Sequence, residues 1–235
     1  MRLDKFLSDN GFGTRKEVKK LIKSQQVIIN NHVMMNSAYH LKENDVIKVN
    51  NEIIERRDHI YLMMNKPKNY VCTSDDINPY VISLIDQYYH KDLFCVGRLD
   101  KDTTGLLLIT NDGTFAHNLI KPNKNVTKTY HALITNKITN KDIELFKKGI
   151  IINDNYQCKP ATLKVIDEFE KTSLVEIVIT EGKFHQVKKM IKAINQEVIE
   201  LKRIKIGLLS LDESLDLGEY RLLSNEEYQL LMNKE

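Results

Sequence analysis

The sequence has little of several residue types that characterise particular protein classes. Its 235 residues include no tryptophan, 4 prolines, 9 glycines and 3 cysteines. The small share of glycine and proline excludes collagen-like and low-complexity chains. The cysteines, Cys72, Cys95 and Cys158, are odd in number and widely spaced, and no two of them form a CxxC pair. We therefore expect neither a disulfide framework nor a metal site.

Long apolar runs are also absent. The longest runs, such as residues 60–64 and 106–109, are far shorter than the roughly 20 residues of a membrane span. Residues 1–5 contain an early acid and no apolar core, so we expect no secretory signal. The hydrophobic content of 42% is nonetheless ordinary for a folded, soluble protein. The expected compartment is the cytoplasm, and we expect no membrane partner.

Charge of either sign is not in large excess, because the formal net charge is only +3. The basic residues are, however, concentrated in two segments. Residues 1–24 hold seven basic residues against three acids, and residues 183–205 hold seven against two. Two basic surfaces on a nearly neutral chain indicate a polyanionic partner that is bound at two places. The alternative interpretation is a pair of solvated helix faces.

The first 24 residues predict two short helices. Apolar residues at helical spacing indicate a first helix over residues 2–9. Thr14 and Glu17 have the spacing of a capping box, which would start a second helix that ends near Ser24. Val18, Leu21 and Ile22 would form the apolar face of this second helix. Its other face would carry most of the cations, namely Arg15, Lys16, Lys19, Lys20 and Lys23.

A small sheet is expected after these helices. Apolar runs at residues 27–29, 33–34 and 46–49 predict its strands. Asn30-Asn31 predicts a tight turn between the first two, because asparagine tolerates a positive φ. Residues 50–59 are polar and show little periodicity, so we place a domain boundary there. The expected domains are 1–57 and 58–235.

The N-terminal segments resemble the S4 RNA-binding domain. The resemblance rests on Arg2-Leu3-Asp4, Thr14-Arg15-Lys16-Glu17, Leu21-Ile22 and Val27-Ile28-Ile29-Asn30. Gln25 and Asn31 stand where that family usually has glycine. The resemblance implies that basic side chains of this module contact RNA phosphates, which position a protein without reading sequence. The residues concerned are Arg2, Lys5, Arg15, Lys16, Lys19 and Lys20.

From residue 60 onward, strand patterns predominate. Strands are predicted at 60–64, 70–73, 93–96, 105–110, 128–134, 161–167, 173–180 and 198–206. Helices are predicted at 79–89, 114–120, 139–148, 185–194 and 224–232. Because strands outnumber helices and do not alternate with them, the expected fold is α+β with a mixed or antiparallel sheet.

The segment from Gly97 to Thr110 carries the strongest chemical signal. Its polar loop, bounded by Gly97 and Gly105, leads directly into an apolar strand. Loops held by a rigid strand often carry function. Composition alone favours a charged turn before a strand, in which Arg98 and Asp100 form a surface ion pair. As a motif, G-R-L-D-x-x-T-x-G-L-L-L-x-T, it resembles the catalytic segment of the pseudouridine synthases that have an N-terminal S4 domain. The resemblance implies that Asp100 is the catalytic aspartate.

Two further segments match this family. Lys128-Thr129-Tyr130 resembles its K-x-Y element, which implies that Tyr130 stacks on the target uracil. The segment 181–190 resembles its third motif, in which Lys188 has the position of the basic residue that pairs with the aspartate. Phe184-His185-Gln186 before Lys188 is similar to the branch that acts on small-subunit ribosomal RNA. Further RNA contacts are expected from Arg98, His185, Gln186, Lys189, Lys202 and Arg203.

The resemblance implies an enzyme without a cofactor that converts uridine to pseudouridine. The implied partner is ribosomal RNA, with uridine 516 of the small-subunit 16S molecule as target, either free or in a partly assembled particle. We expect a monomer. Two alternatives remain open at this point. One is an enzyme of the same family that acts on large-subunit RNA. The other is a non-catalytic RNA-binding protein of ribosome assembly.

Overall fold

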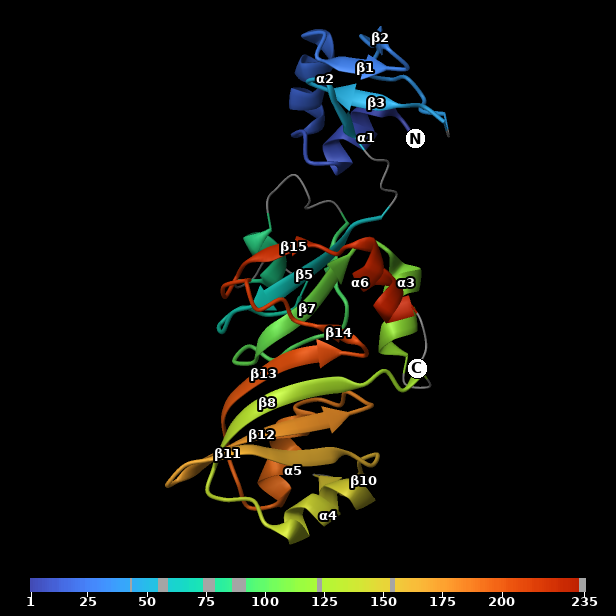
Figure 1. Cartoon of the computed structure of the whole chain (residues 1–235). Helices are drawn as coiled ribbons and strands as arrows, with labels where there is room; N and C mark the ends of the chain where they lie inside the picture. The colour runs from blue at the N-terminus through green and yellow to red at the C-terminus, as the bar shows by residue number, and fades with distance from the viewer. Residues whose placement is uncertain are drawn as a thin grey trace. The chain divides into compact units, whose positions relative to one another are not determined.

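A computed structural model describes residues 1–42, 44–54, 59–73, 79–85, 92–121, 124–152 and 155–232. The chain divides into two units (Figure 1). The first comprises Met1–Ile60 and Ile85–Leu93, and the second comprises Tyr61–Leu84 and Phe94–Glu235. The predicted boundary between residues 57 and 58 lies outside the described residues. Within the described ranges, none of the helices combines the length and the apolar content that crossing a membrane requires.

The first unit packs two helices against a small antiparallel sheet. The helices are α1 (Leu3–Asp9) and α2 (Arg15–Lys23). The sheet has the order β2 (His32–Val33), β1 (Val27–Ile29), β3 (Ile47–Val49) and β4 (Glu52–Ile54). The predicted capping box is confirmed at the start of α2. The Thr14 N–H donates to Oε2 of Glu17 at 2.8 Å, and the Glu17 N–H donates to Oγ1 of Thr14. The buried core includes Leu3, Phe6, Leu7, Val18 and Ile22.

The turns of this unit depend on residues with a positive φ. Asn30 and Asn31 have φ angles of 50° and 66° and form the predicted turn between β1 and β2. Gln25 has a φ of 64° after α2, so glutamine adopts the left-handed conformation at this position. The sequence predicted no strand at residues 52–54, which lie in the segment of little periodicity. A second Asn-Asn turn pairs them with β3 as β4.

The second unit is built on a mixed sheet of nine strands in the described residues. Its main path has the order β11-β12-β8-β13-β7-β5-β15, in which β13 and β7 are parallel and the other neighbours are antiparallel. This confirms the expected α+β class with a mixed sheet. The strands of the path are β5 (Tyr61–Lys66), β7 (Thr104–Thr110), β8 (Lys128–Thr135), β11 (Thr162–Glu168), β12 (Thr172–Ile179), β13 (Val198–Ile206) and β15 (Tyr220–Leu222).

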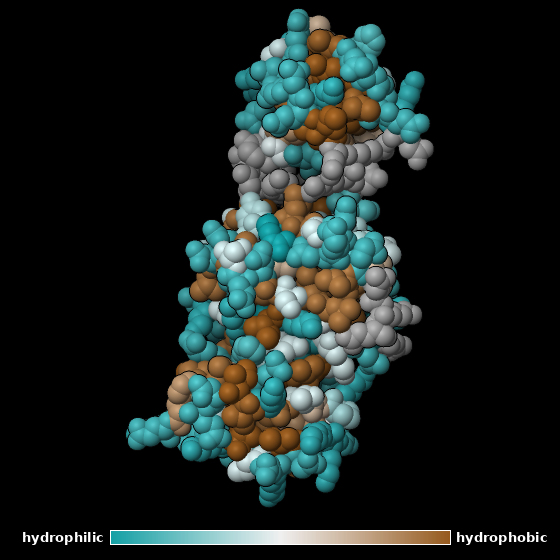
Figure 2. Space-filling view, viewed as in Figure 1, coloured by the Kyte–Doolittle hydropathy of each residue, from teal (hydrophilic) through white to brown (hydrophobic). Residues whose placement is uncertain are grey.

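Helices cover the sheet of the second unit at both ends of its strand order (Figure 1). Near β5 and β7 lie α3 (Gly113–Ile120) and α6 (Asn225–Met232). Near β11 and β12 lie α4 (Asn140–Lys148) and α5 (Gln186–Ala193). A buried cluster beneath α3 and α6 includes Met63, Leu106, Leu108 and Phe115. Figure 2 shows hydrophilic side chains interspersed with apolar areas over both units.

Short elements complete the second unit and correct two predictions. Strand β6 (Phe94–Cys95) pairs with β7, β14 (Leu209–Ser210) pairs with β13, and β9 (Ile151–Ile152) pairs with β10 (Tyr156–Gln157). Residues 81–84 form a 3₁₀ helix, η1 (Val81–Leu84), where an α-helix over 79–89 was expected, and residues 86–89 lie outside the described ones. Val71 makes one isolated bridge to Tyr80 in place of the strand predicted at 70–73.

Candidate active site

A buried lysine, Lys66, binds the backbone of the loop that precedes β7. Lys66, at the end of β5, is 0% exposed. Its Nζ donates to the carbonyl oxygens of Asp100 at 3.1 Å and Thr103 at 3.0 Å. The Leu99 N–H donates to Sγ of Cys72 at 3.4 Å. These contacts fix the backbone on both sides of the Asp100 side chain. Sequence analysis missed Lys66, although a lysine that ends an apolar strand was a visible signal.

Gly105 allows β7 to approach β13 closely. Its φ is 100°, and a β-carbon at this position would lie 2.8 Å from the backbone nitrogen of Arg203 and collide with the Arg203 carbonyl oxygen. Only glycine has the freedom and the lack of a side chain that this crossing requires. The geometry at the end of this loop therefore depends on one residue of the motif that has no reactive side chain.

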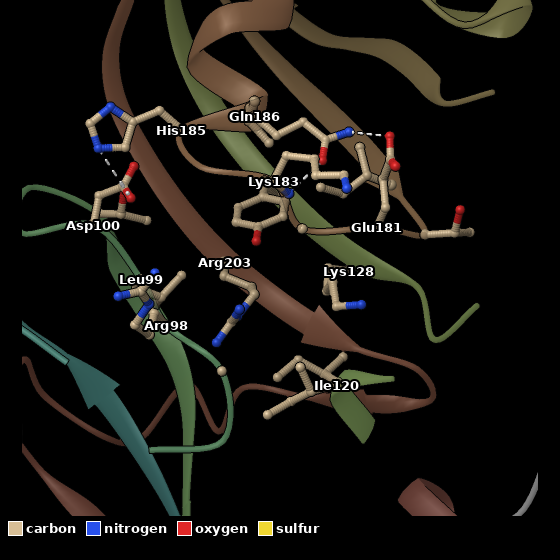
Figure 3. A pocket seen from close by; sticks show the side chains of 18 of the residues that line it. Arg98, Leu99, Asp100, Ile120, Lys128, Glu181, Lys183, His185, Gln186 and Arg203 are labelled. Atoms are coloured by element: carbon tan, nitrogen blue, oxygen red, sulfur yellow. Dashed lines mark hydrogen bonds and ion pairs between the residues drawn. The ribbon is translucent and has the colours of Figure 1, made fainter. Parts of the chain in front are cut away.

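The Asp100 carboxylate faces α5. Its Oδ2 lies 3.2 Å from Nζ of Lys188, and its Oδ1 lies 3.5 Å from Nε2 of His185 (Figure 3). The structure thus brings together the two residues that the motifs paired. His185 immediately precedes α5 and has a left-handed backbone conformation, with a φ of 53°. Its imidazole ring points toward Asp100 (Figure 3).

Lys188 is shared between two carboxylates, because its Nζ also binds Oδ1 of Asp102. Burial lowers the pKa of Lys188, but the hydrogen bonds and charges of Asp102 and Asp100 outweigh burial and raise the pKa above its usual value. Burial raises the pKa of Asp102, but the hydrogen bond and the charge of Lys188 outweigh burial and lower the pKa below its usual value. Lys188 is therefore protonated at neutral pH and supplies a fixed positive charge beside Asp100.

A cavity of about 380 Å³ opens beside this pair. Asp100 and Lys188 line it together with Tyr130, which lies on β8 and is 8% exposed. Apolar side chains of Ile179 and Leu201 form other parts of the wall. The wall of the cavity combines apolar surface with charged and polar side chains, and its size suits a small planar ligand and the sugar attached to it.

Glu181 organises the wall near α5. Its Oε2 accepts from the Tyr156 hydroxyl at 2.7 Å, and its Oε1 accepts from Nε2 of Gln186 at 2.7 Å and from the Lys159 N–H at 2.9 Å. Burial raises the pKa of Glu181, but these three hydrogen bonds lower it overall. Gln186, expected to contact RNA, is only 4% exposed and serves this network instead of the surface. Sequence analysis did not single out Glu181.

The other predicted RNA contacts differ in exposure. Arg98 and Lys202 are exposed, Lys189 is half-buried, and Arg203 is buried within the cavity wall. In the first unit, Arg2 makes a paired hydrogen bond to the buried carboxylate of Asp4. Lys5 is half-buried. The cations on the outer face of α2 are exposed, namely Arg15, Lys16, Lys19, Lys20 and Lys23. Across the described ranges, no group of three or more His, Cys, Asp or Glu side chains could hold a metal ion.

Comparison with known families assigns both parts of the chain. Residues 60–193 match the family described as RNA pseudouridylate synthase, and residues 1–47 match the S4 domain. A solved structure described as a pseudouridylate synthase superposes with a TM-score of 0.70 at 35% identity, over 98% of this chain and 99% of that one.

Curated relatives match over nearly the whole length. The ribosomal small subunit pseudouridine synthase A of Vibrio cholerae is 42% identical over 229 residues, which cover 97% of each chain. The enzyme of the same name from Escherichia coli is 37% identical and covers 97% of this chain and 98% of its own. An uncharacterised RNA pseudouridine synthase of Bacillus subtilis is 40% identical over 98% of both chains.

Proposed function

The chain belongs to the RNA pseudouridylate synthase family and carries an S4 domain at its N-terminus, and we propose that it isomerises one uridine of small-subunit ribosomal RNA, uridine 516 of the 16S molecule. The membership makes the protein a pseudouridine synthase that acts on RNA. The choice of the small subunit is supported by the relatives of that name and by the segment Phe184-His185-Gln186. The proposed setting is the cytoplasm, with the protein acting as a monomer on free RNA or a partly assembled particle.

The observation that carries the proposed chemistry is the Asp100–Lys188 pair at 3.2 Å beside the cavity. In the proposed reaction, Asp100 is the nucleophile, which divides one difficult step into two easier ones. Lys188 orients the carboxylate and balances its charge, as a fixed cation can do without reorganisation during the reaction. His185, at 3.5 Å, limits the rotation of the same carboxylate.

The isomerisation is balanced within the substrate. The bond between N1 of uracil and C1′ of ribose breaks, and a bond between C5 and C1′ forms. The proton lost from C5 is compensated by a proton gained at N1, and nothing is oxidised. The Asp100 carboxylate is regenerated whether it adds to C1′ or to the uracil ring. Tyr130 is proposed to stack on the uracil while the base turns, because an aromatic wall holds a planar ring without fixing its rotation.

The target uridine has to leave its stack in order to enter the cavity, at a cost of a few kcal/mol. Arg98 is exposed two residues from Asp100, where its guanidinium is placed to occupy the vacated space or to bind a neighbouring phosphate. The exposed cations of α2 are proposed to supply further phosphate contacts. Because these contacts release counterions, RNA binding should weaken steeply with salt.

The test is to map pseudouridines in unmodified RNA after incubation with the protein. Small-subunit and large-subunit RNAs, free and as partial particles, are treated with carbodiimide and read by primer extension. We expect one new site, in the small-subunit RNA. Asp100→Asn should form no product and still bind RNA, whereas Asp102→Asn, which removes the other partner of Lys188, should retain most activity.

A new site only in large-subunit RNA would overturn the proposed substrate. Turnover by Asp100→Asn would overturn the proposed role of Asp100 as nucleophile. If wild type formed no product in any substrate, a binding-only role would be favoured.

A further inference from the structure

Two cations line the same cavity away from Asp100, and the proposed reaction does not use them. Lys128 begins β8, and Arg203 lies in β13, paired in register with Tyr130. Both line the cavity. Figure 3 shows Asp100 and Lys128 on opposite sides of the labelled residues, with Arg203 between them. Lys128 and Arg203 therefore lie in a different part of the cavity from Asp100 and its partner Lys188.

Arg203 is buried without full hydrogen bonding. It is 4% exposed, and its Nε donates to the carbonyl oxygen of Leu106 at 2.8 Å. Its Nη2 is buried and has no hydrogen-bond partner among the residues that the structure describes. An arginine is permanently charged, and a buried donor without an acceptor destabilises the fold. Such an exception requires an explanation, and an absent ligand is one.

Lys128 adds a second charge next to this one. Its Nζ donates to the carbonyl oxygen of Val126 at 2.7 Å. Burial, followed by the charges of Arg203 and Lys159, lowers the pKa of Lys128 to about 8. In the described part of the chain, neither Lys128 nor Arg203 has a carboxylate within ion-pair distance.

Glu181, an acid in the same cavity wall, has other hydrogen-bond partners. Both oxygens of Glu181 accept hydrogen bonds, from Tyr156, Gln186 and the Lys159 backbone. The buried guanidinium of Arg203 and the half-buried ammonium of Lys128 therefore both face the cavity, and among the described residues no carboxylate pairs with either. A carbonyl oxygen of uracil could accept hydrogen bonds there, but it would leave both charges unbalanced. An anion satisfies both requirements.

We propose that Lys128 and Arg203 form a subsite for a phosphate group of the target nucleotide, while Asp100 and Tyr130 hold its ribose and base. The subsite rests on the proposed function, since it assigns the remaining part of the same substrate. A guanidinium presents a planar fork of donors that matches two phosphate oxygens, and the ammonium adds a point charge. Holding the phosphate would fix the position of the flipped nucleotide, and with it the approach of C1′ to Asp100.

The experiment compares uridine, uridine 5′-monophosphate and uridine 3′-monophosphate in calorimetric titrations of the full-length protein. We expect one monophosphate to bind wild type about tenfold more tightly than uridine. Which one does so identifies the phosphate on the 5′ or the 3′ side. Lys128→Met should reduce the preference to about twofold or less without affecting uridine itself. The matched control is Lys164→Met, at an exposed lysine of β11 that does not line the cavity, and it should keep the full preference.

Two further measurements test the subsite independently: the monophosphate preference of Arg203→Lys and the single-turnover rate of Lys128→Met. Arg203→Lys retains the charge and loses the fork, so its monophosphate preference should fall between those of wild type and Lys128→Met. In single-turnover assays on ribosomal RNA, Lys128→Met should slow the step at saturating RNA and leave the RNA dissociation constant unchanged, because surface contacts dominate affinity.

Equal binding of all three ligands by wild type, or no detectable monophosphate binding at about 10 mM, would overturn the subsite. An unchanged preference in Lys128→Met would also overturn it. The failure of the proposed function looks different: wild type would make no pseudouridine in any ribosomal RNA and yet would keep its monophosphate preference.

Discussion

Nζ of Lys188 lies 3.2 Å from Oδ2 of Asp100, so α5, whose first turns belong to the third motif, supplies the charge that faces the loop before β7. The two residues are far apart in the sequence, and the mixed sheet brings them together. The same ammonium also binds Asp102, which keeps it directed toward the loop when no substrate is present.

We expect Lys188→Met to lower the rate of pseudouridine formation by about 10²-fold or more, the loss typical of removing one preorganised charge from an active site. Lys188→Arg retains the charge and should fall between Met and wild type. Single-turnover assays on small-subunit RNA measure this, and filter binding should show that both variants bind RNA normally. A wild-type rate in Lys188→Met would show that the pair has only a structural role.

The role of Tyr130 can be divided between its ring and its hydroxyl. Tyr130→Phe keeps the ring, so RNA binding should stay within about twofold of wild type. If the hydroxyl also takes part in removing the C5 proton, product formation should fall by about 10²-fold or more. Tyr130→Leu should impair both the binding of the flipped base and the rate. A fully active Tyr130→Phe would restrict the role of Tyr130 to stacking.

Gly105→Ala should be strongly destabilising. A β-carbon at Gly105 would collide with the Arg203 backbone, and its φ of 100° is unfavourable for alanine. We expect a loss of about 2 kcal/mol or more in the free energy of unfolding. Gly113→Ala is the matched control, because Gly113 has open space around it and begins α3; that variant should be within about 0.5 kcal/mol of wild type, or more stable. Urea denaturation of both variants measures the difference, and equal stability would contradict the close approach of β7 to β13.

The stability conferred by replacing Lys128 should depend on pH. Burial and the charges of Arg203 and Lys159 lower the pKa of Lys128 to about 8 in the fold, against about 10.4 in the unfolded chain. Between these values the unfolded state binds more protons, so the stability of wild type rises with pH. Lys128→Met should therefore unfold at a higher urea concentration than wild type at pH 7, and this advantage should shrink toward pH 10. A difference that does not vary with pH would refute the lowered pKa.

The exposed cations of α2 should act through RNA phosphates. The double variant Lys16→Gln/Lys20→Gln should weaken RNA binding at every sequence and lower the slope of log affinity against log salt by about 1.5 to 2. Lys141→Gln, an exposed cation on α4, serves as the control and should leave the slope unchanged. Filter binding at several salt concentrations measures both. A normal slope in the double variant would remove α2 from the RNA interface.

Local features of this fold could be read from the sequence, because they depend on residues only a few positions apart. The capping box of Thr14 and Glu17, the Asn30-Asn31 turn and the apolar periods of most strands all have this origin. The same local reading failed where a segment had little periodicity, as at β4. It also failed at residues 81–84, where a 3₁₀ turn replaced the expected α-helix.

The order of residues by itself determined which chemistry this protein carries, because the motif around Asp100 and the segments around Tyr130 and Lys188 are specific in type and spacing. Only the tertiary structure decided how these groups meet. The contacts of Lys66 with the loop, the burial of Gln186, and the position of Lys128 and Arg203 away from any described carboxylate partner follow from the register of strands distant in sequence. Side-chain surroundings of this kind depend on long-range pairing and on the exclusion of water, and neither is encoded in a local pattern of residues.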